Sequence, residues 1–127
     1  MLSVSGIYVA LGGLLLIALT FRVVRLRQRL GVALGDGGNV ALKRAIRVHA
    51  NCTEYLPLGL VLLVALDLRQ LAPVWLHVLG AMLLTGRVLH ALGVSRTQEP
   101  FPVRVTGMLL TLAAIVVASA RLLITYL

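Results

Sequence analysis

Three long stretches of this chain contain no aspartate, glutamate, lysine or arginine. They run from Met1 to Phe21, from Gln70 to Gly86 and from Val105 to Ala120. A soluble domain carries roughly 25% charged residues, because its surface must be wetted. Here 13% of the 127 residues are charged and the mean hydropathy is +1.01. The stretches are therefore interpreted as membrane-spanning segments, and most soluble fold classes are excluded.

The spacing of the apolar segments predicts an all-α, integral membrane four-helix bundle. A spanning helix needs about 20 residues to cross roughly 30 Å of hydrocarbon. We expect helices at about 2–21, 39–66, 73–92 and 103–126, in one domain covering residues 1–127. The second helix must extend upstream through polar residues to Asn39, a good N-cap. The first runs too long for a signal peptide and is kept as a membrane span.

Small residues recur on two of the predicted helices. Gly107, Thr111, Ala114 and Ala118 form a narrow stripe on the fourth helix, and Gly6, Ala10 and Gly13 form a similar one on the first. In lipid, helices associate closely where small side chains let their backbones approach. Both stripes are interpreted as ordinary helix-packing surfaces, and Gly93 is expected just past the end of the third helix.

The positive charges predict the orientation of the bundle. The net charge is +8, and the segment from Arg22 to Arg47 alone carries +6. Such a short basic connection marks the cytoplasmic side and favours anionic lipid headgroups, so no nucleic-acid partner is expected. We expect a multi-pass protein of the inner membrane. Its first and third connections, the latter with Arg96 and Glu99, face the cytoplasm, and both termini lie outside.

The second helix concentrates polar side chains on one face. At about 100° per residue, a sector about 120° wide holds three cations, an amide, a carboxylate and a phenol. These residues are Lys43, Arg44, Arg47, Asn51, Glu54 and Tyr55. Glu54 is predicted about 20 Å from the outer boundary, where a carboxylate needs a partner such as Arg47 or Arg44. Pro57 is expected to bend the helix beside this face.

The third and fourth helices bring more polar groups to the same end of the bundle. Arg87 and His90 lie three residues apart on the third helix, and Arg104 opens the fourth. An ion pair that only holds helices together would satisfy Glu54 but leave the remaining polar groups without partners. The arrangement therefore favours an anionic, partly polar ligand bound between helices.

Two other functions remain open from these residues. In a small multidrug-type transporter, Glu54 would couple proton movement to export, although three neighbouring cations suit an anionic ligand better. In an oligomeric scaffold, the basic connection would bind lipid headgroups, and Asn51 and Tyr55 would contact no ligand. Cys52 is interpreted as a small apolar core residue. His49 and His90 lack the further carboxylate or cysteine of a metal site, so no metal is expected.

The run from Arg44 to Pro57, RAIRVHANCTEYLP, resembles the second-helix signature of the membrane-associated eicosanoid and glutathione metabolism family, MAPEG. The run from Gly86 to His90, GRVLH, is similar to the GRxxH stretch of the family's third helix, and Arg104 again opens the fourth. The resemblance covers nearly the whole chain. With Gly35-Asp36-Gly37-Gly38 before the signature, the chain looks most like the small bacterial branch.

The resemblance implies a homotrimer that binds glutathione, as a cosubstrate, at the cytoplasmic end between adjacent subunits. The implied reaction is conjugation of glutathione to an apolar second substrate, or reduction of a lipid hydroperoxide. By position, Arg104 would be the catalytic residue that stabilises the thiolate. The glutathione-binding residues would be Arg44, Arg47, Asn51, Glu54, Tyr55, Arg87 and His90.

The chemistry of glutathione agrees with these implied roles. Its two carboxylates and its amine call for several arginines and one carboxylate partner. A guanidinium within hydrogen-bonding distance lowers the pKa of a thiol without accepting its proton, so Arg104 would stabilise charge rather than act as a base. Two positions depart from the family. Val94 stands where some members have a tyrosine, and Val105 stands where some have a serine.

Overall fold

The fold is described from a computed structural model, over residues 4–96, 98 and 101–127. These residues form four α-helices, and each is long and apolar enough to cross a membrane. They are α1 (Ser5–Leu30), α2 (Val40–Leu68), α3 (Pro73–Ser95) and α4 (Phe101–Ile124). The all-α, four-helix architecture predicted from the sequence is thus confirmed. The predicted start at Leu2, together with Glu99 and Pro100, lies outside the described residues.

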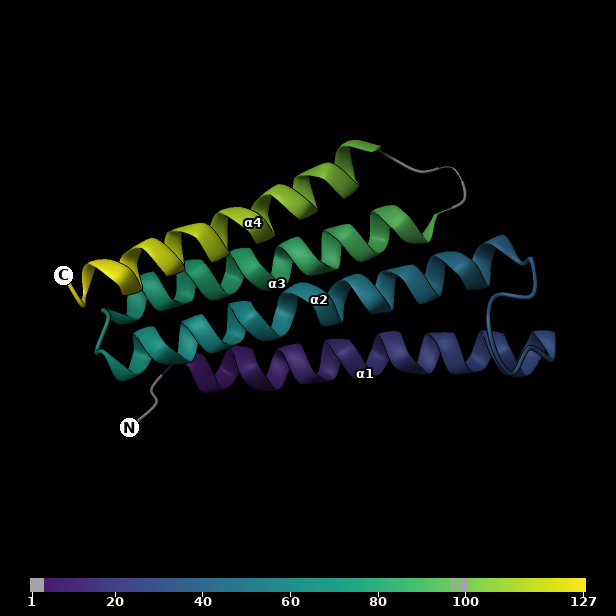
Figure 1. Ribbon diagram of the computed structural model, residues 1–127, viewed down its shortest axis with the longest axis horizontal. Helices are drawn as coiled ribbons and strands as arrows, with labels where there is room; N and C mark the ends of the chain where they lie inside the picture. The colour runs from purple at the N-terminus through teal and green to yellow at the C-terminus, as the bar shows by residue number, and fades with distance from the viewer. Residues whose placement is uncertain (1–3, 97, 99–100) are drawn as a thin grey trace.

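The helices run alternately up and down, in chain order across the bundle (Figure 1). The start of α1, the end of α4 and the α2–α3 turn lie together, and we call this the terminal end. The α1–α2 and α3–α4 connections lie at the opposite, connection end. α1 packs mainly on α2, and α4 packs mainly on α3, with further contacts to α2. α2 and α3 therefore form the centre of the bundle.

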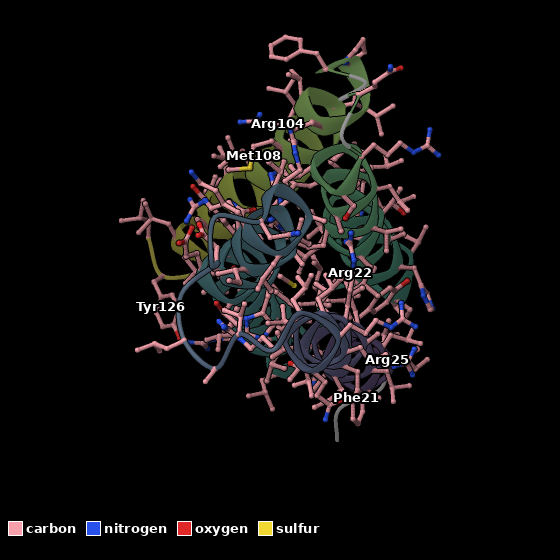
Figure 2. The ribbon with its side chains drawn as sticks, turned by 90° about the vertical axis from the view of Figure 1, so that its right-hand side faces the viewer. Phe21, Arg22, Arg25, Arg104, Met108 and Tyr126 are labelled. Atoms are coloured by element: carbon pink, nitrogen blue, oxygen red, sulfur yellow. The ribbon has the colours of Figure 1, made fainter. Side chains whose placement is uncertain are left out.

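α1 extends well beyond the predicted end at Phe21. Its last turn contains Arg27 and Arg29, whose charges complement the carbonyls at a helix C-terminus. Arg22 points from α1 toward the middle of the bundle (Figure 2) and donates a hydrogen bond to Ser95 Oγ on α3. The basic segment is therefore partly a helical extension rather than a loop. The helix ends at Gly31, whose φ of 65° suits a residue without a side chain.

The predicted N-cap of α2 is confirmed. Asn39 Oδ1 accepts a hydrogen bond from Leu42 N at 3.0 Å, which satisfies one of the free amides of the first turn. Gly37 and Gly38, with φ of 56° and 75°, make the turn before it. The helix then continues through Pro57 to Leu68.

The predicted end of α3 before Gly93 is wrong. The helix continues to Ser95, and Gly93 lies inside it against the start of α4. A Cβ atom on Gly93 would lie 2.7 Å from Arg104 N. This glycine serves close helix packing instead of chain reversal. At the start of α4, Pro102 falls in the first turn, where a missing amide hydrogen costs no helical hydrogen bond.

The small-residue stripe predicted on α4 is buried in the bundle, and all four of its residues are among the buried residues of that helix. The stripe predicted on α1 behaves differently. Gly6 and Gly13 have open space around them, whereas Gly12 is buried against Leu56 and Leu60 of α2. The α1 stripe therefore faces away from the other helices of its own chain. The face of α1 that packs on α2 therefore contains Gly12 and not the neighbouring Gly13 that was predicted.

The start of α1 is bonded to the end of α2. Asp67 Oδ2 accepts hydrogen bonds from Val4 N, Ser5 N and Ser5 Oγ at 3.1, 2.9 and 2.7 Å. Both Asp67 and Ser5 are buried. A carboxylate at this position satisfies free amides of the helix start and complements the positive end of the helix dipole.

Candidate functional site

A cavity of about 480 Å³ lies near the connection end, between α2, α3 and α4. We call it the basic cavity, because four of its lining residues are cationic and no described acidic residue lines it. Its walls are Val40, Lys43, Arg44, Arg47, Asn51, His90, Val94 and Arg104. Five of the eight predicted site residues thus lie around one space: Arg44, Arg47, Asn51, His90 and Arg104.

A second cavity, of about 380 Å³, adjoins the first and is mostly apolar. We call it the apolar cavity, and its walls are Asn51, His90, Phe101, Arg104, Val105, Met108 and Leu109. The two cavities share Asn51, His90 and Arg104. Figure 2 shows Arg104 and Met108 on the same side of α4, well apart from Phe21 and Arg25 on α1. A cationic space and an apolar space therefore meet at one arginine.

Glu54 pairs with Arg47, one of the two partners predicted for it. Arg47 Nη1 donates to Glu54 Oε1 at 3.2 Å, two helical turns apart on α2. The side chains remain 62% and 47% exposed, so the pair lies on the outside of this single chain. In lipid, an ion pair in that position is costly unless protein or water covers it. Arg47 also lines the basic cavity, so the pair lies at the edge of that cavity.

Arg87 is 2% exposed and lines neither cavity. Its guanidinium donates to Asn51 Oδ1 on α2, to Thr111 Oγ1 on α4 at 2.9 Å, and to the Met108 sulfur at 3.4 Å. No described carboxylate pairs with it. Arg87 therefore acts on the basic cavity indirectly, because its bond to the Asn51 side-chain oxygen orients Asn51. The Asn51 amide nitrogen can then donate to another partner.

Tyr55 lies beside Arg87 rather than in the cavity wall. The Arg87 guanidinium carbon is 5.4 Å from the centre of the Tyr55 ring, within the range of a cation–π contact. Arg44 donates to the Val94 carbonyl at 3.1 Å, which ties α2 to α3 across the basic cavity. The position where some family members have a tyrosine is thus occupied here by a valine that lines the cavity.

Close packing of α3 on α4 holds His90, Arg87 and Arg104 at fixed positions. A Cβ atom on Gly86 would lie 2.6 Å from Thr111 Oγ1, and one on Gly107 would overlap the His90 backbone nitrogen. Gly86 and Gly107 therefore let the backbones of α3 and α4 approach closely, next to the positions of Arg87 and His90.

His49 and Cys52 both lie away from the basic cavity, and Cys52 is an apolar core residue as predicted. His49 faces α1, and its Nε2 is 3.0 Å from Thr20 Oγ1, on the opposite side of α2 from the basic cavity. Cys52 is buried in the apolar core with Val48 and Leu56.

Several α4 residues of the site were not anticipated. Met108 and Thr111 were missed as partners of Arg87. They follow Arg104 by four and seven positions, respectively, which is the spacing of one helix face. Phe101, Val105 and Leu109 carry no polar signal, so the sequence could not distinguish cavity walls from lipid-facing residues.

The fold and the cavities define an all-helical integral membrane protein with a cationic binding space between its helices. Comparison with known families agrees, because the model of the MAPEG family matches residues 5–124. The chain belongs to this family, and the resemblance seen in its sequence is confirmed.

The chain is also similar to curated proteins named inner membrane protein YecN, from Escherichia coli strain K12 and from Escherichia coli O6:H1 strain CFT073. Each is 42% identical over 90 residues, which cover 71% of this chain and 69% of the relative. Together with four membrane-length helices, these names support a multi-pass protein of the inner membrane.

Proposed function

We propose that this protein is a glutathione-dependent transferase or peroxidase of the inner membrane. It would join glutathione to an apolar electrophile or reduce a lipid hydroperoxide. The observation that carries the proposal is the meeting of the basic and apolar cavities at Asn51, His90 and Arg104. Such a reaction brings an anionic, water-soluble thiol to an apolar acceptor, and therefore needs two unlike spaces with one shared boundary.

In this proposal, the basic cavity receives glutathione. Arg44, Lys43 and Arg47 supply positive charge for its two carboxylates, and guanidinium groups can bind carboxylates through two parallel hydrogen bonds. Glu54, beside Arg47, offers a carboxylate to the α-amine. Asn51, oriented by Arg87, presents its amide nitrogen to a peptide carbonyl.

The thiol would lie next to Arg104, at the boundary of the two cavities. A nearby guanidinium stabilises the thiolate, which is the nucleophile, and remains protonated throughout. The acceptor would enter the apolar cavity along Val105, Met108 and Leu109 of α4. Conjugation would form a carbon–sulfur bond while the bond from that carbon to its leaving group breaks. In peroxide reduction the thiolate would attack the terminal peroxide oxygen, the O–O bond would break and the lipid alcohol would leave after taking up a proton. The glutathione sulfenic acid would then react with a second glutathione to give the disulfide and water.

We also propose that the protein is a homotrimer, with the site completed between subunits. The most apolar stretches of α1 and α4 are only 17% and 22% buried within one chain, and the Arg47–Glu54 pair lies on its outside. A neighbouring subunit would cover part of both surfaces. Cross-linking and light scattering of the detergent-solubilised protein test this, and a monodisperse monomer that binds glutathione would contradict it.

The transporter alternative draws no support from the site. A proton-coupling carboxylate for a cationic drug needs to change partners, whereas Glu54 is paired with Arg47 and lies beside a cavity lined by cations.

The proposed function is tested by titrating the detergent-purified protein with glutathione in a calorimeter. We expect saturable binding, lost in Arg47→Ala and in Glu54→Ala. The matched control is Arg25→Ala, which removes an exposed cation from α1, outside the basic cavity, and should leave binding unchanged. Absence of binding, in a preparation shown to be trimeric, would falsify the proposal.

A further inference from the structure

A second pair of adjoining cavities lies at the terminal end, far from the basic cavity. One, of about 360 Å³, is lined by Leu71, Trp75, Leu79, Val117 and Arg121, between α3 and α4. The other, of about 260 Å³, shares Leu71, Trp75 and Arg121 and reaches Arg69 in the α2–α3 turn. We call the two together the terminal groove. It is apolar toward the middle of the helices and polar at the end of the bundle.

The cations of the terminal groove have no described acidic partner. Asp67 is the nearest acidic residue in the sequence, but its Oδ2 is bonded to the start of α1. No described ion pair involves Arg69 or Arg121. The Arg69 guanidinium carbon lies 4.1 Å from the centre of the Tyr126 ring, a stacking contact that orients the guanidinium. Two positive charges therefore line one groove at an end of the bundle that otherwise carries little charge.

Aromatic residues place this groove at the boundary of the membrane. Trp75 and Tyr126 are 58% and 67% exposed, at the first turn of α3 and just after α4. Tryptophan and tyrosine concentrate where the hydrocarbon meets the headgroups. We therefore expect the arginines at the level of the lipid phosphates, and Leu79 and Val117 at the level of the upper acyl chain.

We propose that the terminal groove binds one anionic glycerophospholipid of the phosphatidylglycerol type. Its phosphodiester would lie between Arg69 and Arg121, and one acyl chain would lie over Leu79 and Val117. The groove suits an anionic lipid better than a zwitterionic one, because a choline headgroup adds a positive charge beside two arginines. A free phosphate would use the arginines but leave the apolar part of the groove empty. This site is independent of the proposed glutathione chemistry.

The test uses Trp75, the only tryptophan in the chain. The full-length protein is reconstituted in nanodiscs, and brominated acyl chains are introduced on either phosphatidylglycerol or phosphatidylcholine. Bromine quenches tryptophan fluorescence on contact. We expect phosphatidylglycerol to quench Trp75 at lower mole fraction than phosphatidylcholine. Each arginine near an anionic lipid contributes about fivefold to that preference.

The double variant Arg69→Gln with Arg121→Gln should abolish the preference, whereas Arg69→Lys with Arg121→Lys, which keeps both charges, should retain most of it. The matched control is Arg25→Gln with Arg29→Gln at the connection end, which should quench like the unmodified protein. Unchanged elution and helix content confirm that each variant folds.

Three results would overturn the proposal. Equal quenching of the unmodified protein by both lipids would indicate only ordinary contact with surrounding lipid. A preference that survives the double glutamine variant would place the selectivity elsewhere. Release of quenching by inorganic phosphate at constant ionic strength would identify a site for free anions rather than for a lipid.

Discussion

At the scale of single residues, Arg87 and Arg104 show that the same side chain has different roles when it is buried and when it is exposed. Arg87 is 2% exposed, and all its described partners belong to the protein. Arg104 is exposed and lies at the wall of both cavities. In the proposed function, Arg87 positions Asn51, and Arg104 touches the reacting sulfur.

Replacing Arg104 by alanine should separate binding from thiol activation. We expect glutathione affinity to fall little, because Arg44, Lys43 and Arg47 remain. The thiolate fraction at neutral pH should fall about tenfold, the effect of one pKa unit on a thiol. The ultraviolet absorbance of the thiolate measures this in bound glutathione. Arg104→Lys, which keeps the charge, should retain part of the signal. An unchanged thiolate signal in the alanine variant would contradict the role.

Replacing Thr111 by valine tests whether the Thr111–Arg87 hydrogen bond stabilises the arginine that orients Asn51. The valine side chain has a similar shape but offers no acceptor to Arg87 Nε, so a buried donor loses its partner. We expect the protein to be destabilised by about 1–3 kcal/mol, measured by thermal unfolding in detergent. The control is Thr106→Val, on the exposed side of α4, which should change stability little. Equal effects at the two positions would contradict a special role for Thr111.

Much of the candidate site could be predicted from residue spacing. Arg44, Arg47 and Asn51 share one face of a helix by arithmetic alone, and they line one cavity. Arg87 shows the limit of this reasoning. Its spacing from His90 places both on one face of α3, but depth in the bundle decides that His90 lines the cavities while Arg87 lies behind Asn51. Depth depends on how three helices pack, which no single helix encodes.

At the scale of helices, the close contact of α3 and α4 carries the geometry of the site. Gly107 faces the backbones of Gly86 and His90. An added methyl group there must push the helices apart, and both His90 and Arg104 would move with them. The helices themselves follow from hydropathy, and the starts of α2 and α3 follow from Asn39 and Pro73, but the C-terminal ends of α1 and α3 do not. α1 and α3 both continue past the apolar residues because tertiary contacts, Arg22 with Ser95 and Gly93 with Arg104, stabilise the extra turns.

Replacing Gly107 by alanine should therefore destabilise the protein and weaken glutathione binding. Overpacking of a tight contact costs about 1–3 kcal/mol. The control is Gly13→Ala on α1, where nothing lies within 4 Å of the added atom and alanine is the better helix former. Thermal unfolding and calorimetry measure both variants. If Gly107→Ala unfolds at the same temperature as the unmodified protein, the contact is looser than described.

At the scale of the whole molecule, charge and surface hydrophobicity set the surroundings of the protein. Basic residues crowd the connection end, and the terminal end carries few charges. The outer helices α1 and α4 present apolar side chains away from the bundle, which lipid or another subunit must cover.

This distribution predicts that the connection end, with the basic cavity, faces the cytoplasm. In cells that make glutathione, the cavity would then open to the compartment that contains it. Both termini would then lie outside. Fusing a reporter that is active only outside the cytoplasm to Leu127 should give activity, because an excess of lysine and arginine holds a connection on the cytoplasmic side. Activity of a cytoplasm-only reporter at the same position would contradict this orientation.

The bond between Asp67 and the first residues of α1 also has a consequence for how the chain is made. Val4 and Ser5 precede Asp67, whose carboxylate accepts hydrogen bonds from their amides, by 63 and 62 residues. They therefore leave the ribosome well before it. Until Asp67 is synthesised, the Val4 and Ser5 amides lack the carboxylate that accepts their hydrogen bonds in the folded chain. We therefore expect α1 and α2 to insert as a hairpin, closed by this one acidic side chain once α2 is complete.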